Sequence, residues 1–240
     1  MDLFFLIIEY VGIVAFAISG AMVAIDNEAD FIGVIFLAII TSFAGGLCRD
    51  LILGHTPPRF FTSYTVHIII CVATAVIVFI FAAMFKKRYV MAEKRIDAIN
   101  NIVDAAGIGV FSVAGTAIAI EAGFTSPFIP ITLGMITSIG GGMCRDVILR
   151  QIPFVIKKRI YAVACLAGAG VYYFLFMHTE IGAMLATLIG AAVTFTLRIL
   201  ATVFKWNMPK AIDFSALSES DGCSIPEAEE QQSKVPENIL

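Results

Sequence analysis

One segment that combines hydroxyl, glycine and charged residues occurs twice in the chain. The residues from Thr41 to Leu53 recur from Thr137 to Leu149, 96 positions later, and nine of the thirteen pairs are identical. Each copy reads Thr-Ser, then adjacent glycines, then Cys-Arg-Asp, and a proline follows at a matching distance (Pro57 and Pro153). Such a repeat indicates that two halves of the chain use the same residue types for the same purpose.

The hydroxyls and glycines of both copies could line a path for a cation. Adjacent glycines weaken a helix and favour a kink, and a bilayer tolerates a broken helix only beside protein or a water-filled cavity. Hydroxyls and freed carbonyls can then replace part of a cation's hydration shell. Hydroxyls that bond back to their own helix are the alternative, but their paired occurrence favours pore lining. The candidate pore-lining or kink residues here are Thr41, Ser42, Gly45, Gly46, Thr137, Ser138, Gly140, Gly141 and Gly142.

Two Arg-Asp pairs directly follow the glycines, Arg49-Asp50 in the first copy and Arg145-Asp146 in the second. Charges near the membrane interior are costly unless they are paired. We therefore expect these pairs to form either a structural lock or a gate in which that lock opens or shifts.

A second pattern repeats in the apolar segments that precede the two copies. Small and aromatic residues recur there at three- and four-residue steps, which form one stripe on a helix. Such stripes serve close packing of helices or line a path, and Phe16, Ser19 and Phe111 are further pore-lining candidates. Glu9 and Asp104 occupy equivalent positions at the start of each stripe. Since acids inside a membrane face partners or water, they are possible intramembrane functional residues.

The overall composition predicts a membrane protein. Of the 240 residues, 59% are hydrophobic and 15% are charged, too few charges for the surface of a soluble domain. The three histidines are scattered and the cysteines lack CxxC spacing, so we expect no catalytic site and no tightly bound metal. We expect no cofactor and no nucleic-acid partner. Permeating potassium or sodium ions and bound lipid are the candidate ligands.

The elements that must position these residues are seven apolar segments, each near the twenty residues that a bilayer requires. We predict an all-α membrane protein in which two inverted three-helix repeats are followed by a seventh helix, because an odd number of spans reverses the second repeat. The predicted parts are the first repeat at 1–85, a basic cytoplasmic loop at 86–98, the second repeat at 99–177, the seventh helix at 181–204, and a polar acidic cytoplasmic tail without fixed structure at 205–240.

The distribution of Lys and Arg predicts the orientation. Basic residues cluster after the third, fifth and seventh predicted spans, at 86–95, 150–159 and 205–210. In a seven-span chain these segments lie on one side, and Lys and Arg in short loops are retained in the cytoplasm. We therefore expect a multi-pass protein of the inner (plasma) membrane whose N-terminus is outside and whose C-terminus is cytoplasmic.

The doubled Gly-Gly-x-x-Arg-Asp motif, the prolines Pro57 and Pro153 and the span plan resemble the prokaryotic trimeric intracellular cation (TRIC) channels over about residues 1–204. The resemblance implies a homotrimer in which every subunit has its own pore, lined by the kinked second and fifth spans and conducting potassium and, less selectively, sodium. Bacterial relatives are also labelled glycine transporters. A secondary transporter of a small amino acid such as glycine therefore remains the alternative, because inverted repeats with broken helices fit both functions.

Overall fold

The computed structural model describes residues 3–62, 65–91, 93–157, 160–204 and 206. Within these residues the chain is helical and no strand is assigned, so the prediction of an all-α protein is confirmed. The helices are α1 (Leu3–Asp26), α2 (Phe31–Ile52), α3 (Arg59–Thr62), α4 (Thr65–Met84), α5 (Lys86–Met91), α6 (Glu93–Glu121), α7 (Phe128–Ile148), α8 (Phe154–Lys157), α9 (Tyr161–His178) and α10 (Ala183–Val203).

Six of the described helices are long and apolar enough to cross a membrane: α1, α2, α4, the Arg95–Glu121 part of α6, α9 and α10. Helix α7 has a similar length, 21 residues, but is not among them. It contains Pro130, three adjacent glycines and the Arg145–Asp146 pair, all of which lower its mean hydropathy. Instead of a uniformly apolar surface, α7 has small and polar residues that are buried against other helices.

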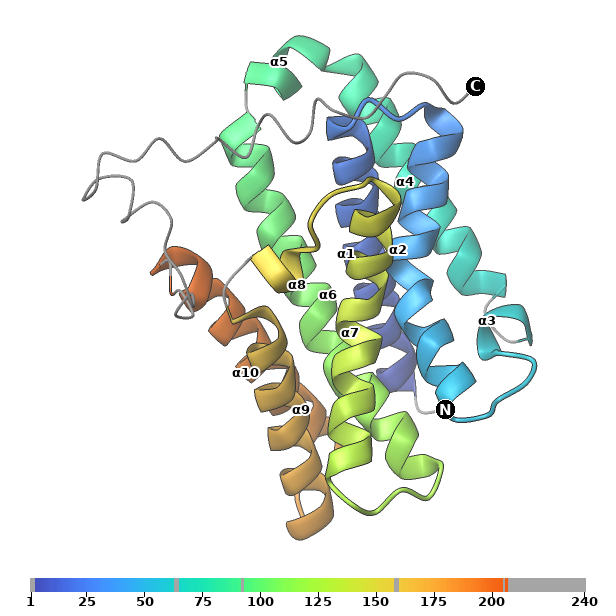
Figure 1. The fold of residues 1–240 in the computed structure, drawn as a ribbon, viewed down its shortest axis with the longest axis vertical. Coiled ribbons are helices and arrows are strands. Elements are labelled where there is room, and N and C mark those ends of the chain that lie inside the picture. The colour runs from blue at the N-terminus through green and yellow to red at the C-terminus, as the bar shows by residue number, and fades with distance from the viewer. Residues whose placement is uncertain (1–2, 63–64, 92, 158–159, 205, 207–240) are drawn as a thin grey trace, which may run out of the picture. The chain divides into compact units, whose positions relative to one another are not determined.

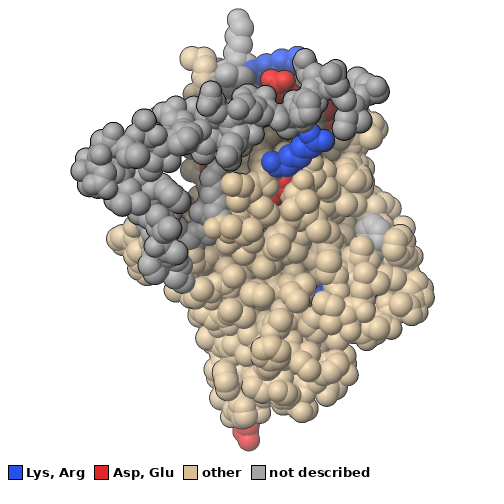
Figure 2. All heavy atoms as spheres, in the orientation of Figure 1, with Lys and Arg blue, Asp and Glu red and all other residues tan. Residues whose placement is uncertain are grey.

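Successive long helices run in alternating directions, and the ends of the bundle differ in charge. Figure 1 shows α1 and α7 running one way and α2 and α6 the other, with α2 and α7 packed against each other near the centre. On the face shown in Figure 2, most of the surface between the ends carries no charge, and Lys and Arg lie at the end where α5 is found. This distribution fits a bundle whose middle faces lipid.

The two halves end their first two helices in the same local way. Backbone amides of Glu28 and Gly123 donate to Ile25 and Ile120 at 3.0 and 2.9 Å, and both residues have a positive φ (58° and 93°). The second helix of each half ends at another left-handed residue, Gly54 (φ 72°) or Arg150 (φ 55°). Glycine adopts this conformation without steric cost, whereas Glu28 and Arg150 do not.

The described residues of the predicted basic loop at 86–98 form α5 and the first turns of α6, whereas its cytoplasmic position stays a prediction. The segment is rich in Lys, Arg, Met, Ala and Glu, which are good helix formers. Tyr89 of α5 donates a hydrogen bond to Asp26 at the end of α1 (3.2 Å). Burial and the charge of Asp26 raise the pKa of the Tyr89 phenol, which therefore keeps its proton. Apart from Trp206, the predicted tail at 205–240 lies outside the described residues.

Candidate functional site

The repeated glycines lie where α2 and α7 cross, and they allow the two backbones to meet. A Cβ atom added to Gly45 would overlap the carbonyl oxygen of Thr137, and one added to Gly141 would overlap the carbonyl oxygen of Thr41. The neighbouring glycines differ, because a Cβ on Gly46 would lie 3.6 Å from the nearest atom, a terminal nitrogen of Arg49. Gly45 and Gly141 are therefore required by a reciprocal backbone contact, and Gly140 lies at the same crossing, because its Cβ would lie 2.9 Å from the Cα of Gly45.

Both helices are continuous through these glycines. The prediction of a break in the helix is therefore wrong, since no turn or coil interrupts either segment, whereas a bend within the continuous helix stays a prediction. The physical reason is the close crossing, because a glycine buried against another backbone loses the solvent exposure that would favour unwinding.

Three of the four predicted hydroxyls bond back to their own helices. Thr41 donates to the carbonyl of Leu37 (2.7 Å), Thr137 to that of Leu133 (2.6 Å) and Ser138 to that of Met135 (2.9 Å). Ser42 instead donates to the carbonyl of Ile13 in α1 (3.4 Å). All four side chains are buried, and their oxygen lone pairs are what a passing cation could use.

A pair of stacked rings joins α1 to α6 beside this crossing. The rings of Phe16 and Phe111 lie 5.2 Å apart at an interplanar angle of 24°. A Cβ on Gly12 would lie 3.0 Å from the ring of Phe111, and one on Gly107 would overlap the ring of Phe16. Each half therefore supplies a glycine that accommodates the phenylalanine of the other half.

Both Arg-Asp pairs are buried ion pairs with similar distances. In the first, Nε and Nη2 of Arg49 donate to Oδ1 of Asp50 at 2.9 and 2.7 Å. In the second, Nε and Nη2 of Arg145 lie 2.9 and 2.8 Å from Oδ1 of Asp146. All four residues are at most 3% exposed. A buried charge of this kind is tolerated only while its partner is present.

The second carboxylate oxygen of each aspartate holds the short helix that follows the motif. Oδ2 of Asp50 accepts from the backbone amide of Arg59 (3.0 Å), the first residue of α3, and Oδ2 of Asp146 accepts from that of Phe154 (2.9 Å), the first residue of α8. Pro57 and Pro153 precede these two helix starts. The proline and the Arg-Asp pair are thus parts of one local structure, which lies at the C-terminal end of α2 and again at the C-terminal end of α7.

The two pairs lie at opposite ends of the bundle, because α2 and α7 run in opposite directions (Figure 1). The second pair has further partners. Nη1 of Arg145 donates to the hydroxyl of Ser19 in α1 (3.1 Å), and Gln151 donates to Asn27 (2.7 Å) beyond the end of α1. At this end α1 and α7 are therefore linked by side chains.

The acids Glu9 and Asp104 each face a side chain from the third helix of their own half. Oε2 of Glu9 lies 3.5 Å from Nε2 of His67 in α4, and the hydroxyl of Tyr161 in α9 donates to Oδ2 of Asp104 (3.0 Å). Asp104 also lies 3.6 Å from Arg198 of α10, whose guanidinium carbon is 4.1 Å from the centre of the Tyr161 ring. Each acid thus ties the first helix of its repeat to other helices.

His67, Tyr161 and Arg198 are not among the site residues predicted from the sequence. Arg198 has no counterpart in a repeat, because it lies in the unpaired last helix. An arginine inside an apolar span is nevertheless a signal in itself, and its costly burial implies an acidic partner.

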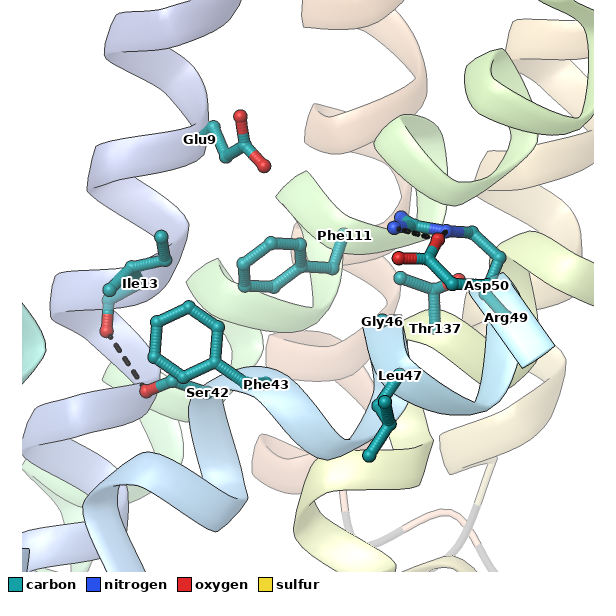
Figure 3. Close-up of a pocket in the computed structure, with 10 residues that line it drawn as sticks. All are labelled: Glu9, Ile13, Ser42, Phe43, Gly46, Leu47, Arg49, Asp50, Phe111 and Thr137. Atoms are coloured by element: carbon teal, nitrogen blue, oxygen red, sulfur yellow. Dashed lines mark hydrogen bonds and ion pairs between the residues drawn. The ribbon is translucent and has the colours of Figure 1, made fainter. Parts of the chain in front are cut away.

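A small cavity lies between the first Arg-Asp pair and the α2–α7 crossing. It has a volume of about 20 Å³, and Figure 3 shows Glu9, Phe111, Thr137 and Arg49 around it. One water molecule needs about 10–15 Å³ by this measure. The cavity can therefore hold a water or a partly dehydrated ion but no larger solute, so this conformation is constricted here.

Comparison with known proteins gives one family. The family model described as "Glycine transporter" matches residues 6–83 and again residues 101–178. A relative described as "UPF0126 membrane protein", from Deinococcus radiodurans, is 33% identical over 71% of this chain and 76% of its own. The "UPF0126 inner membrane protein YadS" of Escherichia coli is 30% identical over 84% of this chain and 92% of its own.

Solved structures of the same fold cover nearly the whole bundle. One described as "a prokaryotic TRIC channel in 0.5 M KCl" is 30% identical over 87% of this chain and 100% of its own, with a TM-score of 0.76. The "TRIC trimeric intracellular cation channel orthologue from Rhodobacter sphaeroides" is 30% identical over 84% of this chain and 98% of its own, with a TM-score of 0.74.

Proposed function

The chain belongs to the membrane protein family that includes these glycine transporter and prokaryotic TRIC relatives, and from this premise we propose that it is a potassium-permeable channel for monovalent cations. The observation that carries the proposal is its similarity to a solved prokaryotic TRIC channel over 87% of the chain at a TM-score of 0.76. The reciprocal contacts between its halves support two inverted three-helix repeats followed by α10. The proposal includes no catalytic activity and no cofactor.

The proposed path runs within one subunit, along the crossing of α2 and α7. Thr41 and Thr137 reach the crossing from opposite sides, each with its carbonyl against a glycine of the other helix. The hydroxyls of Ser42 and Ser138 and the rings of Phe16 and Phe111 lie beside it. Opening requires α2 and α7 to separate or bend enough to expose the backbone and hydroxyl oxygens, which then substitute for water around potassium or sodium.

The Arg-Asp pairs are the proposed gate or lock at the two ends of this path. Asp146 holds α8 while its partner Arg145 reaches Ser19 in α1, so a change in this pair moves two elements together. The equivalent Asp50 holds α3 at the other end. A pair that shifts without separating opens the path at low cost, because neither charge is then left unpaired in the protein interior.

We propose a homotrimer in lipid, with a pore in each subunit, because a solved relative is described as trimeric. The proposed location is the inner (plasma) membrane, with the N-terminus outside and the C-terminus cytoplasmic, so that the basic segments after α4 and α7 are inside. Oligomeric state is checked by native mass spectrometry of the purified protein, where a trimer has three times the chain mass of 25.9 kDa.

The deciding experiment is a recording of single channels from the purified protein in a planar bilayer. We expect discrete current steps in symmetric KCl and a reversal potential near that of potassium in a KCl gradient. The test variant is Gly141→Leu, whose side chain would fill the α2–α7 crossing and block the path. Its matched control is Gly142→Ala, which adds a methyl group where space exists. The proposed pore is contradicted if the wild type gives no current steps, or if the current steps persist unchanged in Gly141→Leu.

The second candidate is a glycine transporter, which the description of the matching family model favours. An alternating-access carrier would accumulate labelled glycine in proteoliposomes in response to an ion gradient, without unitary currents. The constricted cavity of about 20 Å³ would then have to enlarge by several-fold to hold an amino acid. Uptake of glycine without discrete currents would contradict the channel proposal and support a glycine carrier.

A further inference from the structure

A cavity between four of the membrane helices lies away from the α2–α7 crossing and plays no part in the proposed pore. Its volume is about 330 Å³, and side chains of α1, α6, α9 and α10 line it. These are the N-terminal parts of α1 and α10 and the C-terminal parts of α6 and α9, which meet at one end of the bundle (Figure 1). Cavities of this size bind small organic molecules in many proteins.

The lining is apolar apart from a few oxygen-bearing side chains. Aromatic and aliphatic residues form the walls, including Phe5, Val113 and Phe176. Both charged residues in the lining are acids, Glu9 at the boundary with the central cavity and Glu121 at the last residue of α6. An apolar space with two carboxylates favours an occupant with an apolar body and a positive charge.

Thr187 provides independent support for a ligand in this cavity. Its side chain is 2% exposed and lines the cavity, yet its hydroxyl has no hydrogen-bond partner among the described residues. The other buried threonines, Thr41, Thr116, Thr137 and Thr194, all donate to the carbonyl four residues earlier. A buried hydroxyl without a partner is costly, and an ammonium group in the cavity could donate to it.

We propose that this cavity is a binding site for a small hydrophobic amine, with its ammonium group near the carboxylates and Thr187 and its apolar part between α6 and α9. The proposal goes beyond ion permeation, since such an amine is bound and not conducted. Glu9 also lines the central cavity that contains Arg49 and Asp50, so an occupant would be separated from the proposed path by one side chain.

The test measures binding of n-hexylammonium to the purified protein in phosphatidylcholine nanodiscs by titration calorimetry, with empty nanodiscs subtracted. We expect saturable binding at one site per chain. Hexanol and hexanoate have the same apolar chain without the positive charge, and we expect each to bind at least tenfold more weakly. Equal binding of hexanol would overturn the proposal, because the site would then be merely apolar and open to any lipid chain.

Matched variants locate the site. Ala117→Phe fills the cavity and should abolish saturable binding, and Ala114→Leu is a second filling variant should the first fail to fold. Glu121→Gln should weaken the binding of hexylammonium several-fold. Asp97→Asn, which removes an exposed charge at the other end of the same helix, should leave this binding unchanged. Binding that survives in a folded filling variant, or falls equally in Asp97→Asn, places the amine elsewhere. Calorimetry measures the heat of binding and does not depend on ion conduction. The binding result can therefore be interpreted even if the protein proves not to be a channel.

Discussion

The glycines that are adjacent in sequence have different neighbours. Gly141 faces the backbone of Thr41 with no room for another atom, while a Cβ on Gly142 would lie 3.5 Å from the hydroxyl of Tyr161. The same distinction holds for Gly45 and Gly46 across the crossing. Gly45 and Gly141 therefore allow close approach, whereas Gly46 and Gly142, which follow them, have space for a methyl group.

This difference predicts opposite effects of one methyl group at adjacent positions. Gly141→Ala should destabilise the fold by about 1–3 kcal/mol, the usual cost of overpacking, because the overlapping atom belongs to the backbone. Gly142→Ala should be neutral or stabilising by up to about 1 kcal/mol, because alanine favours helix more than glycine does. Thermal unfolding in detergent measures both, and potassium flux should fall only in Gly141→Ala. Equal melting temperatures would show that α2 and α7 do not cross at these residues.

The buried Arg-Asp pairs predict a large effect of one neutralised carboxylate. Asp146→Asn keeps the size of the side chain but leaves Arg145, which is 0% exposed, without its counter-charge. Removing one partner of a buried pair costs about 3–5 kcal/mol, so we expect a markedly lower melting temperature or an abnormally high open probability.

The control for this prediction is Gln151→Ala, which removes an exposed hydrogen bond to Asn27 at the same end of the bundle. Its effect should be under about 1 kcal/mol, since exposed contacts compete with water. If Asp146→Asn and Asp50→Asn both match the parent in melting temperature and in open probability, neither a lock nor a gate can reside in these pairs.

At the scale of elements, equivalent helices of the two halves end alike but with different residues. The left-handed residue after α2 is Gly54, and the corresponding residue after α7 is Arg150, at φ 55°. The left-handed conformation costs a non-glycine residue about 1–2 kcal/mol. At this position the second half therefore carries a local strain that the first half avoids.

Relief of this strain is measurable. Arg150→Gly should raise the free energy of unfolding by about 0.5–1 kcal/mol, because glycine reaches this φ freely but is more flexible when unfolded. Arg150→Ala removes the same charge without relieving the strain, and it should give no gain. Gly54→Ala should lower the free energy of unfolding by about 1 kcal/mol. Equal stabilisation by Arg150→Gly and Arg150→Ala would assign the effect to charge.

At the scale of the whole molecule, the alternating directions of the long helices place α5 and the α6–α7 loop at opposite ends (Figure 1). The distribution of Lys and Arg assigns the α5 end to the cytoplasm. These two observations predict which surface sites a membrane-impermeant thiol reagent can reach from outside the cell.

We expect a cysteine at Ser126, which is exposed in the α6–α7 loop, to be labelled in intact cells. A cysteine at exposed Lys86 should be labelled only after the membrane is opened. Both are introduced into a variant without the five native cysteines. The reverse labelling pattern would show that the protein has the opposite orientation in the membrane. Labelling of both sites from outside would contradict the alternating directions of the helices.

Features that depend on local composition and repetition could be predicted from the sequence. Apolar segments of membrane length predict an all-α membrane protein, and the doubled motif marks the two segments that cross at the centre of the bundle. These inferences succeed because helix length, burial and internal repeats are properties of contiguous residues. The resemblance to a known family likewise rests on contiguous features, namely the doubled motif, the prolines that follow it and the order of the apolar segments.

The partners of the residues identified from the sequence depend on how distant helices pack. The glycines were expected to interrupt their helices, but Gly45 and Gly141 instead fit against the backbones of Thr137 and Thr41. Asp104 was predicted to be an intramembrane acid that faces a partner or water, and its partner is Arg198, 94 positions away, because α10 packs against α6. A local pattern shows that a charge or a small residue is buried, but only the packing of distant helices selects the group that faces it.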